Sequence, residues 1–380
     1  MAGIYIHIPF CRKICSYCDF YKTTWLQLMP EYRIALELDL ERNKSLLNGE
    51  RIETIYFGGG TPSLMEAKDV AGIVDRIGAL FDVSPFCEIT LEANPDDLTP
   101  AWLYNLRTST PVNRLSIGIQ SFNDETLRML NRRHNALQAL ECMNYAKASG
   151  FTNITIDLIY GLPKMDLAEW KRNLEIALAL GIQHLSAYHL TIEPNTGLSR
   201  QVNRGLLRLP EDEESAEQFL LLHEMAEDKG YKHYEISNFA REGFISNHNV
   251  NYWLASKYLG IGASAHSYTL DTRRWNVSDV KKYMHALQHG EKYYDSEDID
   301  NLKKFNEYLM VSLRTMWGIN TGTMNREFGA LAVNAFLKDC EPFISTGMLI
   351  RHENNVVMSP EGWLISDHII SRLMHEDRQQ

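Results

Sequence analysis

Three cysteines near the start of the chain have the type and spacing to hold a metal centre. Cys11, Cys15 and Cys18 follow a C-x3-C-x2-C pattern, directly after an apolar alternating run over residues 3–8. A strand that ends in a short cysteine loop can direct three thiolates to one place, and thiolate sulfur selects zinc, copper(I) or iron–sulfur clusters. Three thiolates on a [4Fe–4S] cluster would leave one iron open to another ligand.

A structural zinc site is the alternative. Zinc in such sites takes four protein ligands, and apart from His7 on the preceding strand no fourth candidate stands near the three cysteines. Three-thiolate sites with an outside fourth ligand nevertheless occur. The remaining cysteines, Cys87, Cys142 and Cys340, are isolated in apolar surroundings, and we expect them to be buried free thiols.

Composition limits the classes of protein to consider. The chain has 380 residues, of which 44% are hydrophobic and 23% charged, which is ordinary for a globular protein of two or three domains. A formal net charge of −11 argues against a general nucleic-acid binder, which carries a basic face. The sequence shows no secretory signal and no apolar run of about 20 residues. We therefore expect a cytoplasmic protein in a reducing compartment.

Strand and helix patterns alternate through the first half of the chain. Because such alternation is typical of βαβ units with a parallel sheet, we predict an α/β fold, and six units fit a partial (β/α)6 barrel better than a closed eight-stranded one. After the first strand, strands are expected at 52–57, 88–92, 114–120, 153–159 and 184–192. Helices are expected at 30–47, 66–81, 102–107, 125–130, 136–149 and 167–180.

Polar residues recur where these strands end. Parallel sheets bind their ligands at the carboxyl edge. Packing of the hydrophobic core alone does not require polar side chains at that edge. The residues in question are Gly59, Glu92, Gln120, Asp157 and His189. The sequence therefore predicts a ligand site along that edge.

From residue 211 the pattern changes. A charged helix over 211–229 precedes the motif at 248–253 and a Gly- and Ala-rich turn at 260–266. Helices and a two-stranded hairpin at 348–358 then predict a smaller helical, winged-helix-like C-terminal domain. We divide the chain into a core domain (1–235), a connecting segment (236–299) and a C-terminal domain (300–380).

The cysteine trio together with the Gly58–Pro62 turn resembles the radical S-adenosylmethionine (radical SAM) superfamily. In that family the trio holds a [4Fe–4S] cluster, whose free iron is chelated by SAM. Iron–sulfur centres reach potentials low enough to reduce a sulfonium, and such cofactors carry radical chemistry. Glycine lets the backbone approach the methionine moiety closely.

Within the superfamily the chain is most similar to oxygen-independent coproporphyrinogen III oxidases and their relatives, the HemW-type haem chaperones. The matching runs are residues 5–11, 58–62, 91–95, 118–122, 131–132 and 157–163. This resemblance implies that nine residues surround SAM: Tyr5, Tyr17, Gly59, Gly60, Thr61, Glu92, Gln120, Arg132 and Asp157.

Two differences near the N-terminus and one motif further along separate the chain from the oxidases. The oxidases carry a further cysteine two residues after the trio, where this chain has Asp19 and Phe20, and they have a longer segment before the first strand. The run His248-Asn249-Val250-Asn251-Tyr252-Trp253 is the second discriminator. From the residues alone a packed or capping histidine is the more common case, but the run resembles the haem-binding motif of the chaperones, which implies His248 as an axial haem ligand.

The resemblance thus implies a protein that binds a [4Fe–4S] cluster, SAM and haem and passes haem to apo-haemoproteins, with respiratory enzymes among the recipients. An electron donor and a peripheral contact with the membrane are further expectations, and no catalytic residue is assigned. The alternative is an oxidase that decarboxylates coproporphyrinogen by radical chemistry. A radical SAM methyltransferase is less favoured, because nothing marks its substrate.

Overall fold

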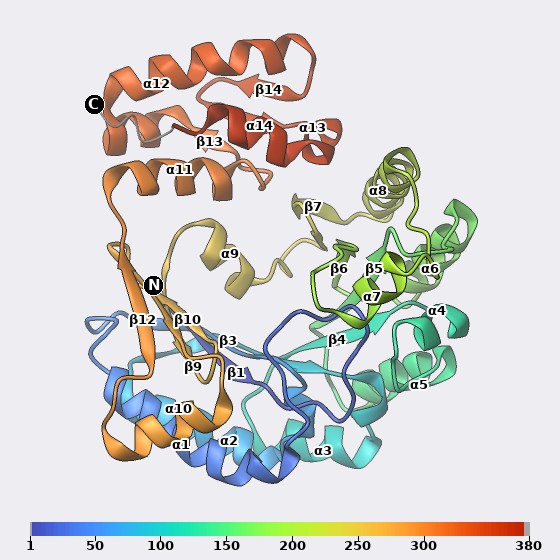
Figure 1. Ribbon diagram of the computed structural model, residues 1–380, viewed down its shortest axis with the longest axis vertical. Helices are drawn as coiled ribbons and strands as arrows, with labels where there is room; N and C mark the ends of the chain where they lie inside the picture. The colour runs from blue at the N-terminus through green and yellow to red at the C-terminus, as the bar shows by residue number, and fades with distance from the viewer. Residues whose placement is uncertain (1, 376–380) are drawn as a thin grey trace.

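A curved, open sheet positions the predicted site (Figure 1). The computed structural model describes residues 2–375. The core strands are rich in Ile and Leu and mostly buried, as expected for parallel strands covered on both faces. They run in parallel in the order β1 (Ala2–Ile8), β2 (Ile52–Gly59), β3 (Val83–Ala93), β4 (Arg114–Gln120), β5 (Ile154–Tyr160) and β6 (His184–His189). The predicted partial (β/α)6 barrel is confirmed.

Helices return the chain between these strands and cover the outer face of the sheet (Figure 1). Side-chain caps fix several of their starts; Asn135 and Gln138, for example, form a capping box at α5. These helices are α1 (Met29–Asn43), α2 (Ala67–Leu80), α3 (Pro100–Ser109), α4 (Asp124–Met129), α5 (Ala136–Ala148) and α6 (Leu167–Ala179). Short 3-10 turns lie at Leu26–Leu28, Pro62–Leu64 and Pro95–Asp97.

The sixth strand is shorter than predicted. It ends at His189 rather than at residue 192, and the chain then turns away toward α7 (Gly197–Asn203). The charged helix α8 (Asp212–Asp228) follows, where predicted.

Both edges of the sheet are extended by short antiparallel strands. β8 (Asn238–Ala240) pairs with β6, and β7 (Lys232–Glu235) pairs with β8. At the other edge β9 (Lys257–Ile261) pairs in parallel with β1 and is followed by β10 (His266–Tyr268), β11 (Thr272–Asn276) and β12 (Tyr294–Asp298). Residues 236–299, which we expected to connect two domains, thus contribute strands β8 to β12 to the main sheet. The same segment also contains the helices α9 (Asn247–Trp253) and α10 (Val280–His289).

The C-terminal residues form a separate, smaller unit above the sheet (Figure 1). Its helices are α11 (Asn301–Ser312), α12 (Thr321–Ser345, with a kink at Gly329), α13 (Pro360–Leu364) and α14 (Ser366–Leu373). A hairpin of β14 (Leu349–His352) and β15 (Asn355–Met358) gains a third strand, β13 (Ile319–Asn320). The smaller helical domain is therefore confirmed. Residue 1 of the predicted core domain and residues 376–380 of the predicted C-terminal domain lie outside the described residues.

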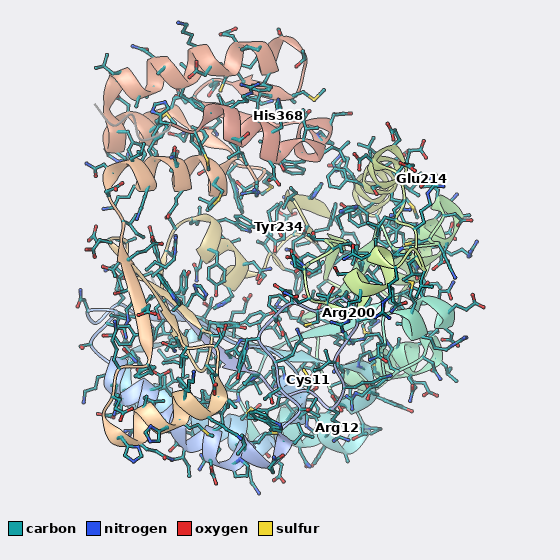
Figure 2. The ribbon with its side chains drawn as sticks, in the orientation of Figure 1. Cys11, Arg12, Arg200, Glu214, Tyr234 and His368 are labelled. Carbon is teal, nitrogen blue, oxygen red and sulfur yellow. The ribbon has the colours of Figure 1, made fainter. Side chains whose placement is uncertain are left out.

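The C-terminal unit contacts the core through β7. The amide of Met316 donates to the carbonyl of Tyr234 at 3.0 Å, and the amide of Ile236 donates to the carbonyl of Arg314 at 3.0 Å. Figure 2 shows Tyr234 between the sheet and this unit. Among the helices described, none has the length and apolar content needed to cross a membrane.

Candidate cofactor site

A pocket of about 570 Å³ lies at the carboxyl edge of the parallel strands. Figure 2 shows Cys11 near the centre of the curved sheet. Among the residues that line the pocket are all three cysteines of the trio and the predicted SAM residues other than Tyr5: Tyr17, Gly59, Gly60, Thr61, Glu92, Gln120, Arg132 and Asp157. His189 lines it as well. The strand ends therefore bring together residues that are far apart in the sequence.

The cysteine loop is fixed to the core by backbone contacts. The amide of Cys11 donates to the carbonyl of Thr23 at 2.9 Å, and the amide of Ser16 donates to that of Leu130 at 3.0 Å. The Thr61 hydroxyl lies 3.4 Å from Cys11 Sγ. Burial raises the pKa of Cys11 to about 11, so this thiol ionises readily only when a cation compensates for the lost hydration.

The three thiols suit a cluster better than a single ion. Within residues 2–375, no three His, Cys, Asp or Glu side chains are grouped closely enough to hold one metal ion. A [4Fe–4S] cluster takes one thiolate per iron, so its three ligands surround the cluster rather than converge on one atom. The trio on the wall of one pocket fits that requirement.

Two half-buried carboxylates, Glu92 and Asp157, line the pocket. Glu92 accepts hydrogen bonds from the Tyr56 hydroxyl at 2.8 Å and from the amide of Gly59 at 3.0 Å. Burial raises the pKa of Glu92 to about 7 and the pKa of Asp157 to about 6. Carboxylates whose pKa is raised by burial are candidates for functional sites, because their oxygens can accept hydrogen bonds from a ligand's hydroxyl or ammonium groups.

A buried arginine beneath these carboxylates was not foreseen from the sequence. Arg114 is 1% exposed and donates to the hydroxyl groups of Thr90 and Thr155. Its positive charge lowers the pKa values of Glu92 and Asp157 against the larger, opposite effect of burial. The only signal in the sequence was a charged residue at the first position of an otherwise apolar strand.

Arg132 links the cysteine loop to the sheet. It donates to Cys15 Sγ at 3.3 Å, to Asn94 Oδ1 at 2.7 Å and to the carbonyl of Gly118 at 2.5 Å. Its Nε is buried and has no hydrogen-bond partner among the described residues. Buried donors are rarely left unpaired, and a guanidinium nitrogen binds carboxylates well. A carboxylate-bearing ligand such as SAM fits this arrangement.

The turn after β2 requires glycine at positions 59 and 60 because of close packing as well as ligand access. Gly59 has a φ of 107°, and a Cβ there would lie 2.5 Å from the His7 ring. A Cβ on Gly60 would lie 2.7 Å from the backbone of Pro9. The turn therefore packs directly against the end of β1, next to the cysteine loop.

A second pocket of about 370 Å³ lies beside the first, between β1 and the β9–β10 edge. Asp19 and Phe20 line both pockets. Tyr5, which we predicted near SAM, lines this second pocket and not the first. The Tyr5 hydroxyl forms a hydrogen bond with His7 Nδ1 at 3.1 Å.

His248 lies behind the second pocket rather than on its wall. It is 2% exposed, and both ring nitrogens are engaged, Nδ1 with the Thr54 hydroxyl at 2.8 Å and Nε2 with the Tyr252 hydroxyl at 3.1 Å. Burial lowers the pKa of His248 to about 3, so the ring is neutral at pH 7. Of the motif, Tyr252 is the residue that lines the pocket.

Comparisons with known proteins agree with this geometry. Residues 5–177 match the model of the radical SAM superfamily, and residues 299–365 match the HemN C-terminal domain. Heme chaperone HemW of Bacillus subtilis is 33% identical over 99% of this chain and 100% of its own length. The chain belongs to the HemW-type haem chaperone family of the radical SAM superfamily.

Further relatives of the HemW family extend the match. Heme chaperone HemW of Lactococcus lactis is 33% identical over 98% of this chain and 97% of its own. A mouse protein, radical S-adenosyl methionine domain-containing protein 1, mitochondrial, is 31% identical over 98% of this chain and 87% of its own. The solved coproporphyrinogen III oxidase (HemN) of Escherichia coli superposes with a TM-score of 0.84 at 23% identity, over 98% of this chain and 90% of its own. The likeness to the oxidase shows the shared fold.

Proposed function

We propose that this chain is a haem chaperone that binds a [4Fe–4S] cluster, SAM and haem, and that transfers haem to apo-haemoproteins. The observation that carries the proposal is the pair of adjacent pockets that share Asp19 and Phe20. One contains the cysteines and polar residues suited to a cluster and SAM, and the other contains Tyr252 of the predicted haem motif. Full-length similarity to curated haem chaperones supports it.

In the proposal Cys11, Cys15 and Cys18 hold the cluster. When bound, the cluster supplies an open iron and an electron at low potential. The Arg132 guanidinium binds the carboxylate of SAM, and Glu92 and Asp157 accept hydrogen bonds from its polar groups. Gly59, Gly60, Thr61, Gln120 and Tyr17 form the walls that orient it. Tyr5, predicted to contact SAM, lines the second pocket instead, and His248, predicted to bind haem, lies behind that pocket; both rings stack on Tyr56.

The proposal includes partners that the chemistry requires. A cluster needs an electron donor, and haem needs an apo-haemoprotein to receive it; we propose respiratory enzymes among the recipients, reached through peripheral contact with the membrane. All six cysteines are free thiols, and Cys87, Cys142 and Cys340 are buried as predicted. Free thiols suit the reducing cytoplasm, where we place the protein.

Anaerobic reconstitution tests the proposal. The wild-type protein should take up about four irons per chain and, with haem added, pass it to an apo-cytochrome b, followed by the Soret band of the recipient after separation. Cys15→Ala should lose iron, whereas Cys142→Ala, which removes a buried thiol outside the pocket, should retain it. A wild-type protein that binds no haem, or that converts coproporphyrinogen III to protoporphyrinogen, would contradict the chaperone assignment.

A further inference from the structure

The second pocket contains a histidine whose ring is free to bind a ligand. His266 opens β10, is exposed, and lines the pocket. No residue among 2–375 makes a hydrogen bond to its ring. His7, the other histidine on the pocket wall, uses both ring nitrogens, Nδ1 with the Tyr5 hydroxyl and Nε2 with the carbonyl of Tyr21 at 2.9 Å. His266 is therefore the histidine of this pocket with an available imidazole nitrogen.

The rest of the wall suits a flat aromatic ligand. The rings of Tyr252 and Tyr258 pack edge to face with centroids 4.7 Å apart, and Phe20 stands 71% exposed in the shared loop. Aromatic faces of this kind stack on planar rings. The volume of about 370 Å³ is at the low end for ligand pockets, so a tetrapyrrole bound there would keep one edge in water. Its carboxylates could then remain hydrated, which avoids the cost of burying them.

A buried network holds the turn that carries His266. The amide of Gly262 donates to Asp39 Oδ2 at 3.1 Å, and the amide of Ala263 donates to the Tyr32 hydroxyl at 2.8 Å. Asn276 Nδ2 donates to the carbonyl of Gly262 at 2.8 Å. Asp39 itself is 0% exposed. A ligand held on a rigid turn is already placed before the metal arrives, so the turn gives His266 the support that an iron ligand needs.

We propose that His266 supplies the protein ligand to haem iron in the second pocket, and that His248 is a positioning residue that acts through Tyr252. The inference rests on the proposed function and names the residue that holds its cargo. Neutral imidazole is a good axial ligand for haem iron. His248 does not line the pocket; it contacts two residues that do, Tyr252 by a hydrogen bond and Tyr5 by ring stacking.

Titration of the full-length protein with ferric haem tests the assignment. Binding is followed by the Soret band, and the ligand type is read by electron paramagnetic resonance of the haem that co-elutes with the protein. His266→Ala should lose the histidine-type spectrum and bind haem at least about ten-fold more weakly. Added imidazole should restore the spectrum, because it can fill the space left by the side chain. His248→Gln should keep the wild-type spectrum even if its affinity for haem falls. His352→Ala, which removes an exposed histidine of β14, should match the wild type in both measurements.

Each result decides between the two histidines. A His266→Ala protein with the wild-type spectrum, together with a His248→Gln protein that has lost it, would overturn the inference and make His248 the ligand. Unchanged spectra in both variants would also overturn it, while leaving haem binding and transfer intact. A wild-type protein that binds no haem would instead refute the proposed function. Far-ultraviolet circular dichroism and iron content of each variant show whether the fold and cluster loop persist.

Discussion

Replacing Glu92 with glutamine tests whether the cofactor pocket holds an unfavourable charge. Burial raises the pKa of Glu92 from 4.5 to about 7. Because the folded state holds the proton more tightly than the unfolded chain, the ionised carboxylate opposes folding above pH 4.5, and this cost becomes constant once the pH passes 7. The shift corresponds to about 3 kcal/mol at pH 8, and to less than about 1 kcal/mol at pH 5.

Thermal melting of the protein without cluster or SAM converts this free energy into a temperature. Unfolding entropy scales with chain length, and for this chain it amounts to about 0.8 kcal/mol per kelvin. Glu92→Gln should therefore melt about 4 °C above the wild type at pH 8 and within about 1 °C of it at pH 5. Glutamine has one carbonyl oxygen in place of the two carboxylate oxygens that accept from Tyr56 and Gly59. A hydrogen bond lost for this reason is independent of pH and shifts both differences equally, so the diagnostic quantity is the change of about 3 °C between pH 5 and pH 8.

Melting curves at pH 5, 6, 7 and 8 then separate the charge from the hydrogen bonds. The matched control is Glu175→Gln on the exposed face of α6, whose curve should run parallel to that of the wild type across this range. A constant difference between Glu92→Gln and the wild type from pH 5 to pH 8 would refute the reasoning. It would mean that Glu92 ionises in the folded protein as easily as in the unfolded chain.

Three further substitutions test the neighbouring contacts. Gly59→Ala should lower the stability by about 2 kcal/mol or more, because of the positive φ at this position and the clash with His7. The control is Gly78→Ala, at an exposed position of α2 where a Cβ has no neighbour; it should raise the stability by about 0.5–1 kcal/mol. Equal shifts in melting temperature for the two variants would contradict this. Arg132→Lys should weaken SAM binding about ten-fold or more by calorimetry, compared at matched iron content because Arg132 also contacts Cys15 Sγ, and an unchanged affinity would count against its role. Phe20→Ala should weaken haem binding about five-fold, while Phe86→Ala, 91% exposed elsewhere, should have no effect in the same titration.

The parallel core was predictable because its signal is local. Each of β1 to β6 is an apolar run bounded by turn residues, and such a run specifies a buried strand without knowledge of its neighbours. The polar residues at the strand ends could also be predicted to meet, because parallel strands present their carboxyl ends on one edge. That reasoning placed Gly59, Glu92, Gln120 and Asp157 in one pocket.

The extensions of the sheet were missed because their signal is not local. β10 has three residues and β9 and β11 have five each, too few for a period to be visible. β9 pairs with β1 across more than half of the chain, with Gly3 opposite Tyr258 and Tyr5 opposite Gly260. No pattern within either segment names that partner. Arg114 was missed for a related reason, since a charged residue is expected outside unless its surroundings are known.

The same distinction explains why the cysteine trio predicts a cofactor but not the task. Cluster ligation needs three thiolates on one loop, and their spacing in the sequence is enough to predict it. The second pocket exists only because β9 and β10 fold back beside β1, so its wall combines residues 5–7, 19–21 and 252–266. Asp19 and Phe20 belong to both walls. If a ligand in one pocket changes the affinity of the other pocket through this loop, the reverse effect must have the same factor, so the effect of SAM on haem affinity should equal the effect of haem on SAM affinity.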